Sequence, residues 1–252
     1  MTEAVSRDAP ELARPRILRQ EWRDLVFLHW AVEPARVAQY LPPDTAPDTF
    51  EGRTYVGLVP FRMVGTGLPR GPAVPWLGTF LETNIRLYSV DSTGRRGVVF
   101  LSMDTDRAAV VGTARSVFGL PYRWARMRHR VEDGVHTYTS TLRWPGVHAA
   151  SSVTVRLGTG FTPPGPLEDF LTARWGLHVA RAGRTWYLPN AHPAWVLRNA
   201  RLDNFTDDGL LDSVGLGELN SRPPDHVAFS EGVPAQFALP SSATTPRGPV
   251  RR

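Results

Sequence analysis

The chain of 252 residues contains no cysteine and no lysine, so all 29 of its strongly basic side chains are arginine. Without cysteine, disulfides, thiolate catalysis and cysteine-ligated metals are excluded. Without lysine, no side-chain amine exists to form an imine with a carbonyl substrate. Arginine stays protonated to a pKa above about 12 and does not replace lysine as that nucleophile. Schiff-base chemistry on a lysine is therefore excluded.

Long hydrophobic runs are also missing. No stretch approaches the roughly 18 apolar residues of a membrane helix, and the first twenty residues carry acids and arginines where a secretory signal would be apolar. The seven histidines form no HxH, HxxxH or HExxH spacing, and phosphate-loop, dinucleotide and GxSxG motifs are absent. We therefore expect a soluble, cytoplasmic protein with no membrane partner, no metal and no cofactor.

The net charge of +5 raises the question of nucleic-acid binding. Three of these charges, Arg247, Arg251 and Arg252, lie in a tail rich in Ser, Thr and Pro, and without them the charge is +2. A charge of that size is ordinary for a solvated surface, so we expect no nucleic-acid partner. The expected partner is a small molecule, and a homo-oligomer is compatible with the sequence.

Prolines (23), glycines (22) and aromatic residues are abundant, which favours a loop-rich, mainly β (α+β) fold with a sizeable core. We expect one β-barrel domain over residues 19–240, between a flexible N-terminus (1–18) and a disordered basic tail (241–252). Hydrophobic patterning predicts helices at 33–41 and 167–175. It predicts strands or hairpins at 25–30, 54–63, 84–90, 98–104, 123–131, 136–142, 152–157, 178–187 and 195–202.

Four polar residues alternate along one of these strands, in the pattern Glu82-x-Asn84-x-Arg86-x-Tyr88. Strand side chains alternate between faces, so the four share one face. That face is either a solvated exterior or the wall of a cavity. If it faces inward, Arg86 would hold a substrate carboxylate or enolate oxygen through its planar fork. Glu82 would then be a general acid or base whose pKa is raised by burial and lowered by any close arginine.

Six arginines and no acid lie between Asp106 and Glu132. Three of them share one strand face, which we expect to be solvated: Arg126, Arg128 and Arg130. Arg123 lies in the opposite phase and Tyr122 in theirs, but Pro121 makes this end uncertain. Either Tyr122 or Arg123 could therefore enter a cavity. A phenol beside a guanidinium would have its ionised form favoured.

Several short motifs occur in the order seen in a known superfamily. The segment from Gly112 to Ala125 resembles the active-site segment of acetoacetate decarboxylases, in which Gly-Phe-Pro-Lys-Lys carries the Schiff-base lysine. Over roughly residues 22–232 the chain resembles the YqjF-like family of unknown function within the acetoacetate-decarboxylase-like superfamily. The matching motifs include Phe27-Leu28-His29-Trp30, Val56-Gly57-Leu58-Val59-Pro60-Phe61-Arg62-Met63, Phe80-x-Glu82-x-Asn84-x-Arg86-x-Tyr88 and His192-Pro193-x-Trp195.

The resemblance implies a closed double-meander β-barrel with one or two outer helices and an internal ligand cavity. It matches the catalytic lysine of the decarboxylases to Tyr122, the neighbouring lysine to Arg123 and the pocket glutamate to Glu82. The change at Tyr122 removes imine chemistry and leaves a polar cavity. Relatives in the superfamily also catalyse aldol, dehydration and cyclisation steps on small oxo acids.

We therefore predict a cofactor-free, Schiff-base-independent enzyme acting by acid/base chemistry on a small carbonyl- or carboxylate-bearing metabolite. The reaction would be dehydration, cyclisation, isomerisation or decarboxylation, in a bacterial protein that fits secondary metabolism. The alternative is a non-catalytic barrel that sequesters or senses a small molecule. The expected catalytic residues are Glu82, Tyr122 and Arg86, and the expected substrate-binding residues are Arg62, Arg115, Arg123, Asn84 and His29. For His29, which lies within an apolar run, the residues themselves favour a satisfied core histidine.

Overall fold

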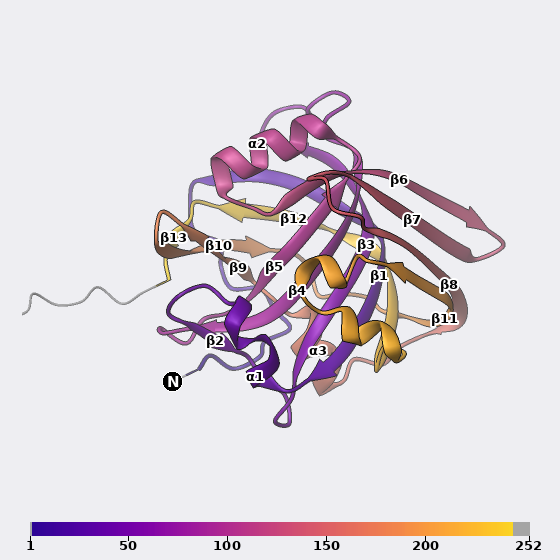
Figure 1. Cartoon of the computed structure of the whole chain (residues 1–252). Coiled ribbons are helices and arrows are strands. Elements are labelled where there is room, and N and C mark those ends of the chain that lie inside the picture. The colour runs from indigo at the N-terminus through magenta and orange to yellow at the C-terminus, as the bar shows by residue number, and fades with distance from the viewer. Residues whose placement is uncertain (1, 244–252) are drawn as a thin grey trace, which may run out of the picture.

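A computed structural model describes residues 2–243 of the chain (Figure 1). Residues 244–252, on which most of the predicted basic tail falls, lie outside the described residues. The first strand begins at Arg16, within the predicted N-terminal segment 1–18, and a two-residue strand, Ser241–Ser242, lies at the start of the predicted tail. In the described part of the chain, no helix has the length and apolar character needed to cross a membrane.

Strands make up most of the described chain, and helices are few and short. The strands are β1 (Arg16–Val32), β2 (Thr45–Pro47), β3 (Thr54–Gly67), β4 (Phe80–Asp91), β5 (Arg96–Thr105), β6 (Tyr122–Glu132), β7 (Val135–Trp144), β8 (Ala150–Phe161), β9 (Gly176–Arg181), β10 (Arg184–Ala191), β11 (Arg198–Asp208), β12 (His226–Ala238) and β13 (Ser241–Ser242). The α-helices are α1 (Pro34–Val37), α2 (Ala108–Phe118) and α3 (Pro166–Thr172), and the 3-10 turns are η1 (Ala38–Tyr40), η2 (Asp212–Val214) and η3 (Gly217–Ser221).

All the strands belong to one sheet of order β13-β10-β9-β5-β6-β7-β8-β11-β12-β1-β3-β4-β2. Two further pairings, β5 with β4 and β10 with β12, close the sheet on itself (Figure 1). Neighbouring strands are antiparallel except at β5–β6 and β5–β9, which are parallel. The predicted mainly β fold is confirmed, and the closure leaves most of the long strands without a free edge.

The closed sheet buries side chains on both of its faces. The second half of β1 sends Val26, Leu28 and Trp30 into a packed apolar core with residues of β4, β7 and β8. The first half of β1 sends Leu18, Gln20 and Trp22 toward a cavity on the other face. The alternation reverses at Asp24, whose φ of 54° lies in the left-handed region. The first half of β1 thus lines the cavity, and its second half contributes to the packed core.

The helix α2 is the parallel crossover between β5 and β6, and it lies across one end of the ring (Figure 1). No helix is predicted at 108–118 from the sequence, where Gly112 and several β-branched residues have a low helix propensity. The structure has a helix here, and the helix covers the cavity with Val110, Ala114 and Phe118. It ends at Gly119, whose φ of 70° lets its N–H reach the carbonyls of the last turn.

Other predicted elements are present in the structure, but they begin or end at different residues. The helix expected at 167–175 is α3, and the one expected at 33–41 is α1 continued by η1. The strand expected at 195–202 is β11, which begins at Arg198. The sequence analysis missed β12 entirely. The exposed row of Arg126, Arg128 and Arg130 on β6 is confirmed.

Candidate functional site

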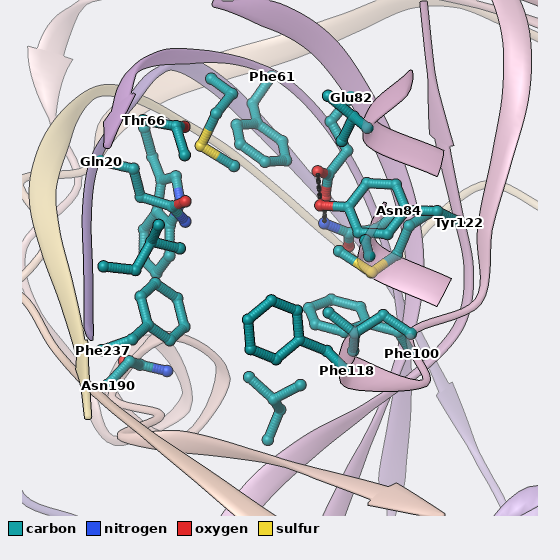
Figure 2. A pocket seen from close by; sticks show the side chains of 18 of the residues that line it. Gln20, Phe61, Thr66, Glu82, Asn84, Phe100, Phe118, Tyr122, Asn190 and Phe237 are labelled. Atoms are coloured by element: carbon teal, nitrogen blue, oxygen red, sulfur yellow. Dashed lines mark hydrogen bonds between the residues drawn. The ribbon is translucent and has the colours of Figure 1, made fainter. Parts of the chain in front are cut away.

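The cavity beside β1 has a volume of about 380 Å³, within the range of roughly 300–1,000 Å³ typical of small-molecule sites. Its walls are mostly apolar and aromatic. Figure 2 shows Phe61, Phe100, Phe118 and Phe237 around the open space. A few polar side chains interrupt this surface, and their placement decides what the cavity can bind.

The most deeply buried polar group on the wall is the carboxyl of Glu82. Tyr122 donates its hydroxyl hydrogen to Glu82 Oε2 over 2.7 Å, and Asn84 Nδ2 donates to Oε1 over 3.3 Å. Glu82 is 1% exposed, Asn84 4% and Tyr122 6%. Figure 2 shows the three side chains together on one side of the cavity. The row predicted on β4 therefore faces inward, and its opposite face, with Ile85 and Leu87, joins the packed core.

Backbone contacts on both sides of Tyr122 fix its position. Gly119 ends α2 in the left-handed region, and two residues later the carbonyl of Pro121 accepts a hydrogen bond from Met103 N over 3.1 Å. Tyr122 then pairs with Met103 of β5, which pairs with Asn84 of β4. The phenol thus reaches across β5 to β4.

Arg123 points away from the cavity. It pairs with Asp104 over 2.6 Å and donates to Ser213 Oγ over 2.8 Å on the packed side of the sheet. It shares a strand face with Ala125, as alternation predicts, but that face is the packed one. Tyr122, on the other face, is the residue that enters the cavity. The buried Arg123–Asp104 pair anchors the first residues of β6 and so helps to place Tyr122.

Burial sets the protonation of the Glu82–Tyr122 pair. Loss of solvent raises the pKa of Glu82 to about 7, although hydrogen bonds from Tyr122 and Asn84 oppose the rise and the charge of Asp104 adds to it. Burial and the Glu82 charge raise the pKa of Tyr122 well above its usual value. The ionised phenol expected beside a guanidinium is therefore wrong, because the neighbour of the Tyr122 hydroxyl is a carboxyl group and not Arg123.

Arg86 lies at the other end of the β4 row and also lines the cavity. Its Nη2 donates to the hydroxyl of Tyr88 over 3.1 Å and to the carbonyl of Leu171 over 3.2 Å, whereas its buried Nε has no partner among residues 2–243. Arg86 forms no ion pair with any described residue. The other arginine on the wall, Arg174, is paired with Asp48. Arg86 is thus the cavity-lining cation with no carboxylate partner in the described structure.

His29 does not line the cavity. It is fully buried, with its Nε2 2.8 Å from the hydroxyl of Tyr88 and its Nδ1 3.0 Å from Nδ1 of His226. Burial, helped by the charges of His226 and Arg86, lowers the pKa of His29 well below its usual value. His29 is thus a satisfied core histidine, the interpretation that the residues themselves favour, and not a substrate ligand.

Three of the arginines expected at the substrate also lie elsewhere. Arg62 is exposed on the outer face of β3 and pairs with Asp24 over 3.0 Å. Arg115 is on the exposed face of α2, where its Nη1 donates to the carbonyl of Tyr122 over 3.0 Å. Arg123 is in its buried ion pair. Of the eight predicted site residues, the structure thus brings four to the cavity: Glu82, Asn84, Arg86 and Tyr122.

The polar residues on the opposite wall are not among the residues predicted from the sequence. Gln20 of β1, Thr66 of β3 and Asn190 of β10 face the open space across from Glu82 (Figure 2). They come from three strands that are far apart in the chain, so no local motif marks them. Within residues 2–243, no three His, Asp or Glu side chains gather to hold a metal ion.

Comparison with known proteins finds one matching family and a relative of similar length. The model of the DUF2071 family, described as an uncharacterised conserved protein, matches residues 19–234. The uncharacterised protein YqjF of Bacillus subtilis (strain 168) is 28% identical over 218 residues, which cover 86% of this chain and 89% of YqjF.

Solved structures share the fold at low sequence identity. The enduracididine biosynthesis enzyme MppR, complexed with pyruvate, superposes with a TM-score of 0.60 at 17% identity, over 92% of each chain. An acetoacetate decarboxylase-like enzyme from Sphingomonas wittichii RW1 gives 0.58 at 12%, over 90% of this chain and 92% of its own. Acetoacetate decarboxylase from Legionella pneumophila gives 0.55 at 16%, over 91% and 89%. The resemblance to YqjF-like proteins and to the decarboxylase-like fold is confirmed.

Proposed function

The chain belongs to the DUF2071 family, and from its cavity and its acetoacetate-decarboxylase-like fold we propose that it is a Schiff-base-independent enzyme of small carbonyl- or carboxylate-bearing molecules. The observation that carries the proposal is the buried Glu82–Tyr122 pair on the cavity wall. A carboxyl group held by a phenol in an apolar cavity can exchange a proton with a bound molecule. The chemistry is therefore general acid/base catalysis.

The pKa of Glu82 suits this role. At about 7, it leaves both the carboxylate and the carboxylic acid populated near neutral pH. A general acid or base is most effective when its pKa lies near the working pH. A fully solvated glutamate, with a pKa near 4.3, would be present almost entirely as a weak base.

The proposed step is enolisation. The Glu82 carboxylate takes a proton from the carbon next to the substrate carbonyl, and the C–H electron pair forms the C=C bond while the carbonyl π pair moves onto oxygen. Tyr122, neutral because its pKa is raised, turns its O–H from the now protonated Glu82 to the enolate oxygen and stabilises the charge. Return of the proton to another atom completes an isomerisation. In a dehydration, the enolate electron pair re-forms the carbonyl and makes the new C=C bond while the β-hydroxyl leaves as water with the proton that Glu82 holds.

Arg86 supports a substrate that carries a carboxylate. It shares the inward face of β4 with Glu82 and lacks a carboxylate partner among the described residues, so a bound anion would supply one. The structural relative MppR has been solved with pyruvate, a 2-oxo acid. That protein supports 2-oxo acids as the first compounds to test here.

The test is exchange of the C3 protons of pyruvate and phenylpyruvate with D₂O, followed by proton NMR. Wild-type protein is expected to accelerate exchange above the protein-free rate. Glu82→Gln keeps the size of the side chain but loses the base, and is expected to slow exchange by about 10²–10⁴-fold. Glu132→Gln, an exposed change at the end of β6, serves as the matched control with the wild-type rate.

Equal exchange rates for wild type and Glu82→Gln would contradict the assignment of Glu82 as the base. Binding without any exchange would instead favour the alternative, a protein that sequesters or senses the same class of molecule. Calorimetric affinities measured on the same samples separate the two, because a catalytic carboxylate predicts lost turnover with nearly unchanged affinity.

A further inference from the structure

The wall across from Glu82 holds polar groups that the proposed reaction does not use. Gln20 is 8% exposed and Asn190 is 5% exposed, and both line the cavity. The carboxamide of Gln20 makes no hydrogen bond to any described residue. The buried Oδ1 of Asn190 and the buried Oγ1 of Thr66 likewise have no partner between residues 2 and 243.

Buried polar groups without partners are destabilising, so native proteins rarely keep them without a reason. Gln20, Thr66 and Asn190 all lie on the wall of the cavity across from Glu82 (Figure 2). Gln20 pairs with Ala235 on one side of β12, and Asn190 pairs with Phe237 on the other. Thr66 lies on β3, the strand that pairs with the other edge of β1. A ligand in the cavity can supply hydrogen-bond partners to the carboxamide of Gln20 and to Nδ2 of Asn190, whereas Asn190 Oδ1 and Thr66 Oγ1 are covered.

The three groups select an uncharged partner. Carboxamides and a hydroxyl offer both donors and acceptors but no net charge. A charged group held against them would lose its water without gaining a counter-charge. A hydroxyl, carbonyl or amide group would instead satisfy them in a neutral hydrogen-bond network.

The space between the two polar walls indicates the rest of the ligand. Phe61 and Phe118 lie between Glu82 on one side and Gln20 and Asn190 on the other (Figure 2). The cavity of about 380 Å³ is more than twice the roughly 150 Å³ that holds benzene in a protein interior. A three-carbon oxo acid would leave most of it empty, whereas an aromatic ring joined to an oxo acid would occupy much more of it.

We propose that Gln20 and Asn190, with Thr66 beside them, bind an uncharged hydrogen-bonding group at the far end of an aromatic or similarly apolar substrate. The placement of the reacting carbonyl at Glu82 and Tyr122 rests on the proposed function. The opposite subsite sets the length and the terminal chemistry of the molecule that is accepted.

A pair of compounds that differ by one distal hydroxyl tests this subsite: phenylpyruvate and 4-hydroxyphenylpyruvate. Calorimetric titration of the wild-type protein is expected to show about tenfold tighter binding of the hydroxylated compound. Gln20→Leu and Asn190→Leu are expected to reduce that ratio toward one, with phenylpyruvate binding unchanged or tighter. Thr113→Val, another polar-to-apolar change on the cavity wall, is the matched control and should keep the tenfold ratio.

A wild-type protein that binds both compounds equally, or binds neither, overturns the subsite, and this comparison needs no variant to fold. A hydroxyl preference that survives in both leucine variants overturns it as well. The proposed function fails independently. If the preference is present but C3 exchange is absent, the subsite stands and the enolisation does not. Glu82→Gln should keep the hydroxyl preference while losing exchange, because it acts at the other end of the ligand.

Discussion

Replacement of Glu82 by glutamine should change the pH dependence of folding stability in a defined direction. Burial raises the pKa of Glu82 from 4.5 to about 7. Because one pKa unit corresponds to about 1.36 kcal/mol, the folded state favours the protonated carboxyl by about 3 kcal/mol. This contribution is fully present below pH 4.5, and it is lost as the pH rises through 7, since the unfolded chain then releases a proton that the folded protein holds.

The free energy of unfolding of wild type minus that of Glu82→Gln should therefore fall by about 3 kcal/mol as the pH rises, most of it between pH 5 and 8. Urea denaturation of both proteins at pH 5, 6, 7 and 8 measures it. Groups common to both proteins cancel in the difference, and the lost charge interactions with Tyr122 add only an offset. Glu132→Gln, exposed on β6, should give a nearly flat difference. A flat or rising difference for Glu82→Gln would refute the raised pKa and with it the acid/base role.

Three further substitutions test the neighbouring contacts. Tyr122→Phe should slow C3 exchange by about 10- to 100-fold. The acid limb of the pH profile of exchange should also move to higher pH, because the hydrogen bond from the phenol lowers the pKa of Glu82. An acid limb at the wild-type pH would contradict that coupling. Arg123→Met should lower the free energy of unfolding by about 3–5 kcal/mol, because it leaves Asp104 buried and unpaired. The double variant with Asp104→Leu should recover part of that loss, and urea denaturation of the two variants measures both values. Arg86→Gln should weaken calorimetric binding of phenylpyruvate about tenfold or more, with unchanged affinity indicating that the carboxylate binds elsewhere.

The polar row on β4 could be predicted from the sequence because it depends only on strand alternation. Glu82, Asn84 and Arg86 recur every second residue, and all three reach the cavity. The choice between Tyr122 and Arg123 could not be made this way. Strand alternation puts Tyr122 and Arg123 on opposite faces of the sheet. Because both faces are buried, alternation does not predict which of the two faces lines the cavity.

No local sequence pattern predicts the polar residues on the opposite wall of the cavity. Gln20 and Asn190 are 170 positions apart and share one wall of the cavity because β12 pairs with both β1 and β10. The reversal at Asp24 depends on one left-handed residue inside a strand; aspartate adopts this conformation more often than most residues, but most aspartates do not. The helix α2 was hidden for a related reason, since its stability comes from packing over the cavity and not from its own residues.

The central claim is that the Glu82–Tyr122 pair performs chemistry on a small carbonyl-bearing molecule. Its most direct test is to incubate wild-type protein and Glu82→Gln separately with a metabolite extract from the cell that makes the protein, and to profile both by mass spectrometry. The account predicts at least one carbonyl- or carboxylate-bearing compound that wild type consumes and Glu82→Gln does not. A compound that both proteins retain and neither consumes would contradict catalysis and leave a binding protein.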